Sequence, residues 1–232
     1  MNRVQAIVPA AGRGERFSGR IEKPYVLLGS VPMLVHTLRA LERVPEVDSI
    51  ILVVNRARKK WVQQKFLTQY RIQRIAEVII GGKTRMESVY AGLSCLATKT
   101  RWVLIHDGAR PLVSPKVVSR LIQFAKRQGA CCLGIRLKDT IKRVSQNSLI
   151  QETVDRDQLR AIQTPQVFRR DWLVRAYQRA LKEGYQGTDD AALVERLGIR
   201  VKIVDGEERN IKITTPEDLV IARALLRVKS SC

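Results

Sequence analysis

The chain has 232 residues, 45% of them hydrophobic, which suits one large α/β domain or two small ones. Lys and Arg outnumber Asp and Glu by 42 to 22, and the resulting charge of +20 favours anionic partners, either nucleic acid or a phosphorylated substrate. No apolar run approaches the roughly 20 residues of a membrane span, and the N-terminal sequence has no pattern of an export signal, so we expect no membrane partner.

The first apolar run, residues 4–8, leads into a basic, glycine-rich loop that contains Gly12, Gly14 and Arg16. Glycines let backbone N–H groups approach a ligand closely, and a run of such groups binds anions. The loop lacks the third glycine of a dinucleotide fingerprint and the Gly-Lys-Ser/Thr ending of a Walker loop. We interpret it as a seat for a polyphosphate; the alternative is a basic surface turn after a first strand.

Strand-like and helix-like segments then alternate, as judged from continuous apolar runs and from apolar residues at helical spacing. Expected strands cover residues 4–10, 50–54, 77–80, 102–105 and 130–135, and expected helices cover 32–42, 57–67, 84–96 and 114–129. Basic residues in 56–74 interleave with Trp61, Phe66 and Tyr70, a combination that can bind single-stranded nucleic acid. The helical spacing of these aromatics favours a core position instead, with the basic residues facing water.

The second half of the chain begins with a polar hairpin over residues 138–155 that has little apolar area to bury by itself. We therefore expect it to form an arm that packs against a second subunit. A strand over 162–168, a helix over 170–183, short strands over 201–204 and 211–213, and a final helix from Thr215 follow. Between them Thr188 is expected to cap a short helix, with Asp189 and Asp190 favourably placed in its first turn.

This alternation predicts an α/β fold with a mostly parallel sheet, helices on both faces and one domain over 1–232. Ligands of such sheets bind beyond the carboxyl ends of the strands. The rule places residues 12–16, 81–88 and 106–111 on one rim. The cysteines, at 95, 131, 132 and 232, show no metal-ligand spacing. We expect the adjacent Cys131 and Cys132 to be small buried hydrophobes, and a reduced cytoplasm is the simplest compartment.

A series of short motifs ties these segments together. In chain order they are Pro9-Ala-Ala-Gly-x-Gly-x-Arg16, Lys23-x-Tyr25, Gly81-Gly82-x-x-Arg85-x-x-Ser88-Val89, His106-Asp-x-Ala-Arg-Pro111, Asp139-Thr140, Thr153-x-Asp-Arg156, Gln163-Thr-Pro-Gln166, Thr188-Asp-Asp-Ala191 and Asn210-x-Lys212-Ile-Thr214. Over nearly the whole chain the set resembles the 2-C-methyl-D-erythritol 4-phosphate cytidylyltransferases. It departs from the family pattern at Pro24, Lys83 and Gly108, where Gln, an acidic residue and Ala are expected.

The resemblance implies a Rossmann-like nucleotidyltransferase fold with a protruding hairpin arm, 138–156, that forms a homodimer. It implies transfer of CMP from CTP to methylerythritol phosphate with release of pyrophosphate. A phosphate nucleophile is already ionised at pH 7, so the reaction needs positioning and charge neutralisation rather than a strong base. His36 and His106 accordingly lie in no recognisable nucleophile–base pair, and we expect His106 to be a packed loop histidine.

The resemblance also assigns site residues. Arg16 and Lys23 stabilise the transition state at the α-phosphate. The nucleotide pocket is implied at Pro9, Ala10, Ala11, Gly12, Gly14, Gly82 and Ser88. The sugar phosphate is implied at Asp107, Arg110, Thr140, Thr164, Arg156 and Lys212, with Arg156 coming from the partner subunit. Mg²⁺ sits mainly on triphosphate oxygens, with Asp107 as its one candidate protein ligand, while Arg85 is alternatively a structural ion-pair partner.

Two other functions stay open at this point. A cytidylyltransferase for ribitol 5-phosphate has a similar fold, and both acceptors are polyol phosphates. A basic nucleic-acid-binding protein on an inactive nucleotidyltransferase fold is an alternative of another class, which the presence of both Arg16 and Lys23 disfavours.

Overall fold

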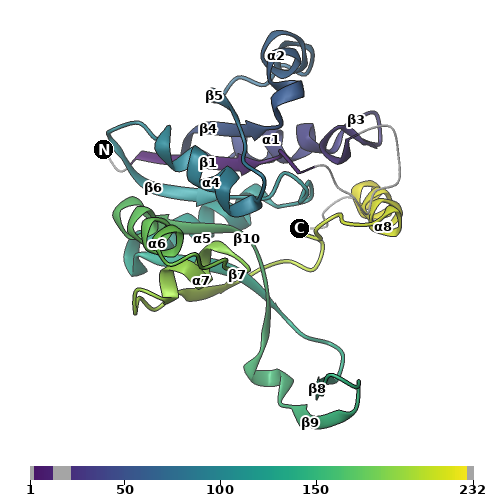
Figure 1. The fold of residues 1–232 in the computed structure, drawn as a ribbon. Helices are drawn as coiled ribbons and strands as arrows, with labels where there is room; N and C mark the ends of the chain where they lie inside the picture. The colour runs from purple at the N-terminus through teal and green to yellow at the C-terminus, as the bar shows by residue number, and fades with distance from the viewer. Residues whose placement is uncertain (1–2, 13–21, 229–232) are drawn as a thin grey trace.

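The computed structural model describes residues 3–12 and 22–228, built around one seven-stranded sheet (Figure 1). The strand order is β11-β7-β10-β6-β1-β4-β5. The strands are β1 (Arg3–Pro9), β4 (Val47–Val54), β5 (Ile75–Ile80), β6 (Thr100–Ile105), β7 (Ala130–Arg136), β10 (Arg160–Arg169) and β11 (Lys202–Asp205). Only β10 runs antiparallel to its neighbours, β6 and β7, so the predicted mostly parallel sheet is confirmed.

Helices cover both faces of this sheet, because successive side chains of a buried strand point to opposite sides. In β1, Val4, Ala6 and Val8 face a core shared with α1 (Met33–Glu42) and α5 (Pro115–Gln128). Ile7 faces the opposite core. The helices of that second face are α4 (Arg85–Ser94), α6 (Arg170–Lys182) and α7 (Asp190–Glu195).

The helix starts follow their capping residues, with one correction. Thr84 accepts a hydrogen bond from the amide of Glu87 at the start of α4, and Thr215 forms a capping box with Asp218 at the start of α8 (Pro216–Arg227). The predicted cap of α7 was wrong by one residue. Asp189, rather than Thr188, is the N-cap, and its carboxylate accepts from the amide of Ala192 at 2.9 Å.

The predicted strand over residues 211–213 was also wrong, since this segment has no strand partner. Its apolar residues serve a third, small core instead. Ile213 is fully buried there beside Leu28 and Met33, and its amide donates to the carbonyl of Ala109 at 2.9 Å. The apolar residues of this segment therefore indicate burial, but a short apolar run does not distinguish a buried loop from a strand.

The predicted helix over 57–67 is an irregular one. It comprises a 3₁₀ turn (Arg56–Arg58), α2 (Lys59–Trp61), a π-helix (Val62–Phe66) and α3 (Leu67–Gln69). Phe66 is buried and its ring lies 5.1 Å from Trp61 and 5.0 Å from Tyr70, which confirms that these aromatics pack together. Four short elements were not predicted: a 3₁₀ helix (Lys23–Tyr25), β2 (Leu27–Leu28), β3 (Val31–Pro32) and another 3₁₀ helix (Arg156–Gln158).

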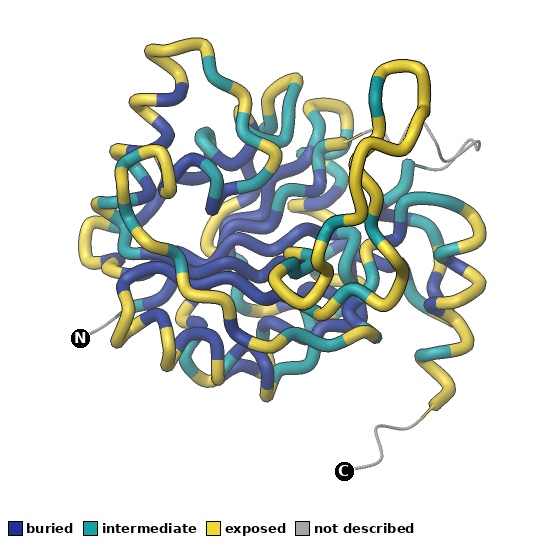
Figure 2. The backbone as a smooth tube through the Cα atoms, turned by 90° about the horizontal axis from the view of Figure 1, so that it is seen from below, coloured by how far each residue is buried: buried dark blue, intermediate teal, exposed yellow. Residues whose placement is uncertain are grey.

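The predicted hairpin arm is present as β8 (Ile141–Val144) paired with β9 (Ile150–Val154), and it projects away from the sheet (Figure 1). Figure 2 shows the contrast between the buried central strands and the exposed arm. Val144, Leu149 and Ile150 are 53%, 68% and 65% exposed. Within the described part of the chain, no helix combines the length and apolar character needed to cross a membrane.

Candidate active site

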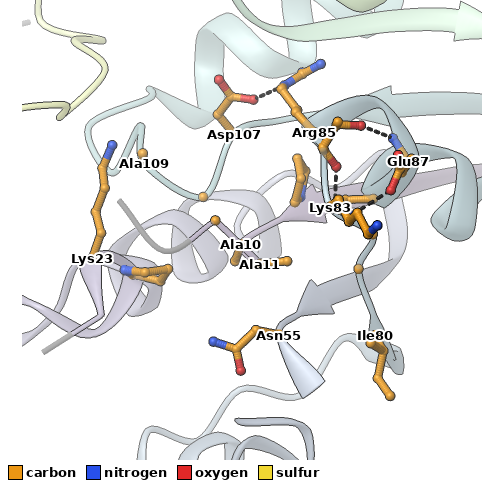
Figure 3. Close-up of a pocket in the computed structure, with 18 of the residues that line it drawn as sticks. Ala10, Ala11, Lys23, Asn55, Ile80, Lys83, Arg85, Glu87, Asp107 and Ala109 are labelled. Atoms are coloured by element: carbon orange, nitrogen blue, oxygen red, sulfur yellow. Dashed lines mark hydrogen bonds and ion pairs between the residues drawn. The ribbon is translucent and has the colours of Figure 1, made fainter. Parts of the chain in front are cut away.

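A cavity of about 870 Å³ lies beyond the carboxyl ends of β1, β4, β5 and β6 (Figure 3). Its walls come from segments far apart in the sequence, as the rule for parallel sheets predicts. The lining residues are Pro9–Gly12, Lys23, Pro24, Met33, Asn55, Arg56, Ile80–Arg85, Glu87, Ser88, Asp107–Ala109 and Lys212. The predicted rim is thus confirmed for Gly12, 81–85, Glu87, Ser88 and 107–109, whereas Gly14 and Arg16 lie outside the described residues.

Small residues let the β1 and β5 loops approach each other along one wall. The amides of Ala10 and Gly81 donate to the β4 carbonyls of Val53 and Val54 at 2.7 and 2.9 Å. A Cβ on Gly81 would lie 2.6 Å from both the Ala11 Cβ and the Ser88 Oγ, a distance at which the wall must shift. Glycine at this position is therefore dictated by packing, and the wall leaves backbone accessible to a ligand.

Gly108 marks a second close approach. A Cβ there would lie 3.2 Å from the Ala10 Cβ and 3.3 Å from the Leu34 Cδ1, so the loop after β6 rests tightly on the loop after β1. The departure from the family pattern at this position consequently removes a tight contact rather than a functional group.

Lys83 and Glu87 form the edge of the cavity beside Gly82. The Glu87 carboxylate accepts from the Lys83 amide at 2.6 Å, and a Cβ on Gly82 would lie 2.3 Å from the Glu87 Cβ (Figure 3). The turn over 81–84 is therefore closed by its own helix, α4. Ser88, one turn further along, bonds the Thr84 carbonyl at 2.9 Å.

Cations surround the Asp107 carboxylate. The Arg85 Nε and the Lys212 Nζ each lie 2.8 Å from one of its oxygens. Burial alone raises the pKa of Asp107, but the charges of Arg85 and Lys212 outweigh it, so the pKa lies below its ordinary value. Asp107 is therefore an anion that holds two cations at the cavity, one from α4 and one from the loop before α8.

Arg85 continues this network into the core. Its Nη2 lies 2.7 Å from the Asp190 Oδ2, and Asp190 is fully buried and also accepts a hydrogen bond from Tyr177. Asp190 lies in the first turn of α7, as predicted, and its carboxylate also serves a buried ion pair that was not predicted. The alternative reading of Arg85 as an ion-pair partner is confirmed.

A directed chain of hydrogen bonds runs behind Asp107. The Arg110 carbonyl can only accept, so the His106 Nε2, 3.1 Å away, carries the proton. The Nδ1 then accepts from the Thr164 hydroxyl at 3.1 Å, and the Thr164 oxygen accepts from the Asp107 amide at 3.0 Å. His106 is fully buried, which confirms the packed loop histidine. Thr164 lies behind the cavity wall and supports Asp107 rather than lining the cavity.

We expect the hydrogen-bonded, buried position of His106 to make the stability of the protein depend on pH. Burial lowers the pKa of His106 to about 4, whereas an unfolded chain has a histidine pKa near 6.5. Between these values the unfolded state binds the extra proton, so the free energy of unfolding falls as the pH falls. The loss at pH 5 relative to pH 7 should be about 2 kcal/mol from His106, measured by urea unfolding.

His36 must be controlled for, because burial also lowers its pKa and gives the same sign. A His36→Gln variant should keep most of the pH dependence, and a His106→Gln variant should lose most of it. Equal stability of the wild type at pH 7 and pH 5 would contradict the assignment.

The remaining predicted residues lie elsewhere. Arg110 is partly buried beside the site, where its Nη1 donates to the Asn210 carbonyl at 2.6 Å. Thr140 and Arg156 are exposed at the base of the arm and do not line this chain's cavity. Arg156 donates to the carbonyl of Lys138. Sequence reasoning missed Asn55 at the cavity, although its place directly after the expected strand 50–54 was a usable signal.

Comparison with known proteins agrees with this geometry. A family model described as 2-C-methyl-D-erythritol 4-phosphate cytidylyltransferase matches residues 4–228. Proteins with that name from Syntrophus aciditrophicus and Geobacillus kaustophilus are 44% and 46% identical, over 97% and 96% of this chain and 96% of each relative.

Solved structures agree with the fold as well. The structure of 4-diphosphocytidyl-2C-methyl-D-erythritol synthase from Anaerococcus prevotii has a TM-score of 0.87 at 34% identity, covering 97% of this chain and 96% of that one. The 2-C-methyl-D-erythritol 4-phosphate cytidylyltransferase from Thermus thermophilus has a TM-score of 0.79 at 31% identity, covering 96% and 98%. The match to the family model over nearly the whole chain, together with relatives above 40% identity, shows that this chain belongs to the 2-C-methyl-D-erythritol 4-phosphate cytidylyltransferase family.

Proposed function

We propose that this protein transfers CMP from CTP to 2-C-methyl-D-erythritol 4-phosphate, the reaction that supplies an isoprenoid precursor. A phosphate oxygen of the acceptor forms a bond to the α-phosphorus of CTP, the α–β phosphoanhydride bond breaks, and pyrophosphate leaves. The observation that carries the proposal is the cavity itself, in which Lys23 and Arg85 approach from different sides of a wall of small residues (Figure 3). Lys212, paired with Asp107, is a third cation of the cavity lining.

The chemistry of the cavity fits two anionic reactants. The acceptor phosphate is ionised at neutral pH, so no side chain has to remove its proton, and His106 is fully committed to the chain behind Asp107. What the transition state needs is positive charge beside the phosphoryl oxygens. Lys23 supplies it from one side of the cavity, and Arg16, which lies outside the described residues, is its proposed companion.

Lys212 and Asp107 are proposed to receive the acceptor. Lys212 lines the cavity from the loop before α8, and its ammonium is held 2.8 Å from the Asp107 carboxylate. That contact fixes the direction of a flexible side chain before the substrate arrives, which reduces the ordering cost of binding a phosphate.

Nucleotidyltransferases typically use a divalent metal ion, and we propose that Mg²⁺ enters on the triphosphate of CTP. Within the described residues no group of three or more His, Cys, Asp or Glu side chains is arranged to hold a metal ion. Both oxygens of Asp107 already contact cations, so Asp107 is better suited to orienting Arg85 and Lys212 than to serving as a ligand. The ion supplies additional neutralisation of the triphosphate when bound.

Removal of divalent metal is accordingly expected to leave the fold unchanged. A metal held by the protein would stabilise the native state by mass action, whereas an ion that arrives with CTP does not. EDTA should shift the thermal midpoint of the nucleotide-free protein by less than about 1 °C, measured by calorimetry. In the presence of CTP, adding Mg²⁺ should raise the midpoint, and a large loss with EDTA alone would reveal a protein-held ion.

We further propose that the arm, 138–156, joins two copies of the chain into a homodimer. It exposes Val144, Leu149 and Ile150 at 53–68%, more than any large apolar residue of the seven-stranded sheet within the described residues. Because Thr140 and Arg156 do not line the cavity of their own chain, they are proposed to complete the cavity of the partner.

The proposed function is tested by incubating the protein with MgCTP and methylerythritol phosphate and following the products by ³¹P NMR. We expect equal amounts of pyrophosphate and a cytidine diphosphate ester, and neither product without the acceptor. A protein that releases no pyrophosphate and instead shifts single-stranded RNA in a salt-dependent manner would support the nucleic-acid alternative.

A further inference from the structure

Lys23 lies on a single 3₁₀ turn, Lys23–Tyr25, whose own length cannot fix the position of its side chain. The residues on either side of Lys23 are held instead by one distant segment, residues 55–66. Pro24, which is buried, follows Lys23 directly and restricts the backbone of this turn.

Glu22 is the first of two anchors. Its Oε1 lies 2.9 Å from the Arg58 Nε, and its Oε2 accepts from the Asn55 side-chain amide. Asn55 in turn accepts from the Arg58 amide at 2.9 Å, so the three residues form a closed set of hydrogen bonds. Asn55 also lines the cavity, which places this set directly beside it.

Tyr25 is the second anchor. Its ring is 8% exposed and lies edge-on to Trp61 and Phe66, at 5.1 and 5.5 Å between centroids. The guanidinium carbon of Arg58 lies 5.6 Å from the Tyr25 centroid and 5.5 Å from that of Trp61. Arg58 thus contacts both anchors.

The π-helix explains how one segment makes both contacts. Residues five apart on an α-helix point roughly 140° away from each other. The wider turn over Val62–Phe66 brings Trp61 and Phe66 to the same side, with 5.1 Å between their centroids. Such π turns are frequent at functional sites.

We propose that Arg58 is a positioning residue that fixes the turn carrying Lys23, so that the ammonium of Lys23 is held ready at the cavity before CTP binds. This inference rests on the proposed function. Arg58 lies outside the cavity lining and acts through Glu22 and Tyr25. An ion pair as exposed as this one contributes little to folding, whereas a displacement of about 1 Å at a reacting group can cost about 100-fold in rate.

A large effect on rate together with a small effect on stability separates a positioning role from a structural one. We expect Arg58→Met to lower kcat about 10-fold to 100-fold, with KM for CTP changed by less than about 3-fold. The thermal midpoint should stay within a few degrees, since an ion pair this exposed contributes little to the free energy of unfolding. Arg58→Lys should recover part of the rate, and Lys60→Met, an exposed lysine of the same segment, should behave as the wild type.

A double-mutant cycle with Lys23→Ala decides the inference. If Arg58 acts through Lys23, Arg58→Met should lower the rate of Lys23→Ala less than about 2-fold, because that side chain is already absent. Multiplied effects, or an Arg58→Met rate equal to that of Lys60→Met, would overturn it. Failure of the proposed function would be seen separately, as absence of pyrophosphate release by the wild type.

Discussion

Replacing Lys23 with alanine is expected to lower kcat at least about 100-fold while binding of the sugar phosphate persists. Lys23 lies on the opposite side of the cavity from Arg85 and Lys83, with Ala10 and Ala11 between them (Figure 3). A cation at that position stabilises charge that develops on the phosphoryl oxygens only in the transition state. Losing one oriented cation of this kind costs about 3–4 kcal/mol of barrier.

The measurement is steady-state pyrophosphate release together with the dissociation constant of methylerythritol phosphate. A matched control is Lys65→Ala, because Lys65 is an exposed lysine of the π-helix and lies outside the cavity lining. The control should turn over at the wild-type rate. Near-normal turnover of Lys23→Ala would defeat the assignment of Lys23, whatever its effect on binding.

Replacing Arg156 with alanine is expected to raise KM for the sugar phosphate about 10-fold to 100-fold, with a much smaller change for CTP. A guanidinium that binds a phosphate in two places contributes a strong charge-assisted contact. Arg156 is exposed at the arm and does not line the cavity of its own chain, so we propose that it makes this contact in the cavity of a partner chain. Equal effects on both substrates would contradict this role.

Mixing two defective variants tests the exchange between subunits. In a mixed dimer of Lys23→Ala and Arg156→Ala chains, one cavity receives both wild-type residues, one from each chain. Equal mixing should therefore restore about a quarter of wild-type activity after subunit exchange, as two-fold symmetry requires. Activity that stays at the level of the separate variants would place Arg156 outside the partner's site. Lys138→Ala, at the arm base, is the control. A mixture of Lys138→Ala and Lys23→Ala chains should have the same activity as a mixture of wild-type and Lys23→Ala chains.

Much of the fold follows from the sequence because buried parallel strands are continuous apolar runs. β4 shows this clearly, since Ile50 to Val54 are all fully buried. Residues 211–213 contain a similar apolar pattern, but they form a loop without a strand partner. Burial alone therefore does not specify a strand. The π-helix was not predictable for a related reason. The spacing of the aromatic residues indicates a helix but does not fix the number of residues per turn.

The candidate site also has one part that the sequence predicts and one part that it does not. The rim was predictable because the carboxyl ends of parallel strands converge, which brings Ala10, Gly81 and Asp107 together. The pairing of Arg85 with Asp190 was not, because the two are 105 residues apart and meet only through tertiary packing. An aspartate in the first turn of a helix has a sufficient local explanation in the helix dipole, so the sequence offered no reason to seek a distant partner.

The central claim is that this cavity gathers CTP and methylerythritol phosphate for direct transfer. It is tested most directly by pyrophosphate release with MgCTP and either methylerythritol phosphate or ribitol 5-phosphate, run in parallel on one preparation. We predict a kcat/KM for methylerythritol phosphate about 100-fold above that for ribitol phosphate, the discrimination that a pocket achieves against a substrate with one extra hydroxyl group. A higher kcat/KM for ribitol phosphate, or no release with either acceptor, would contradict the account.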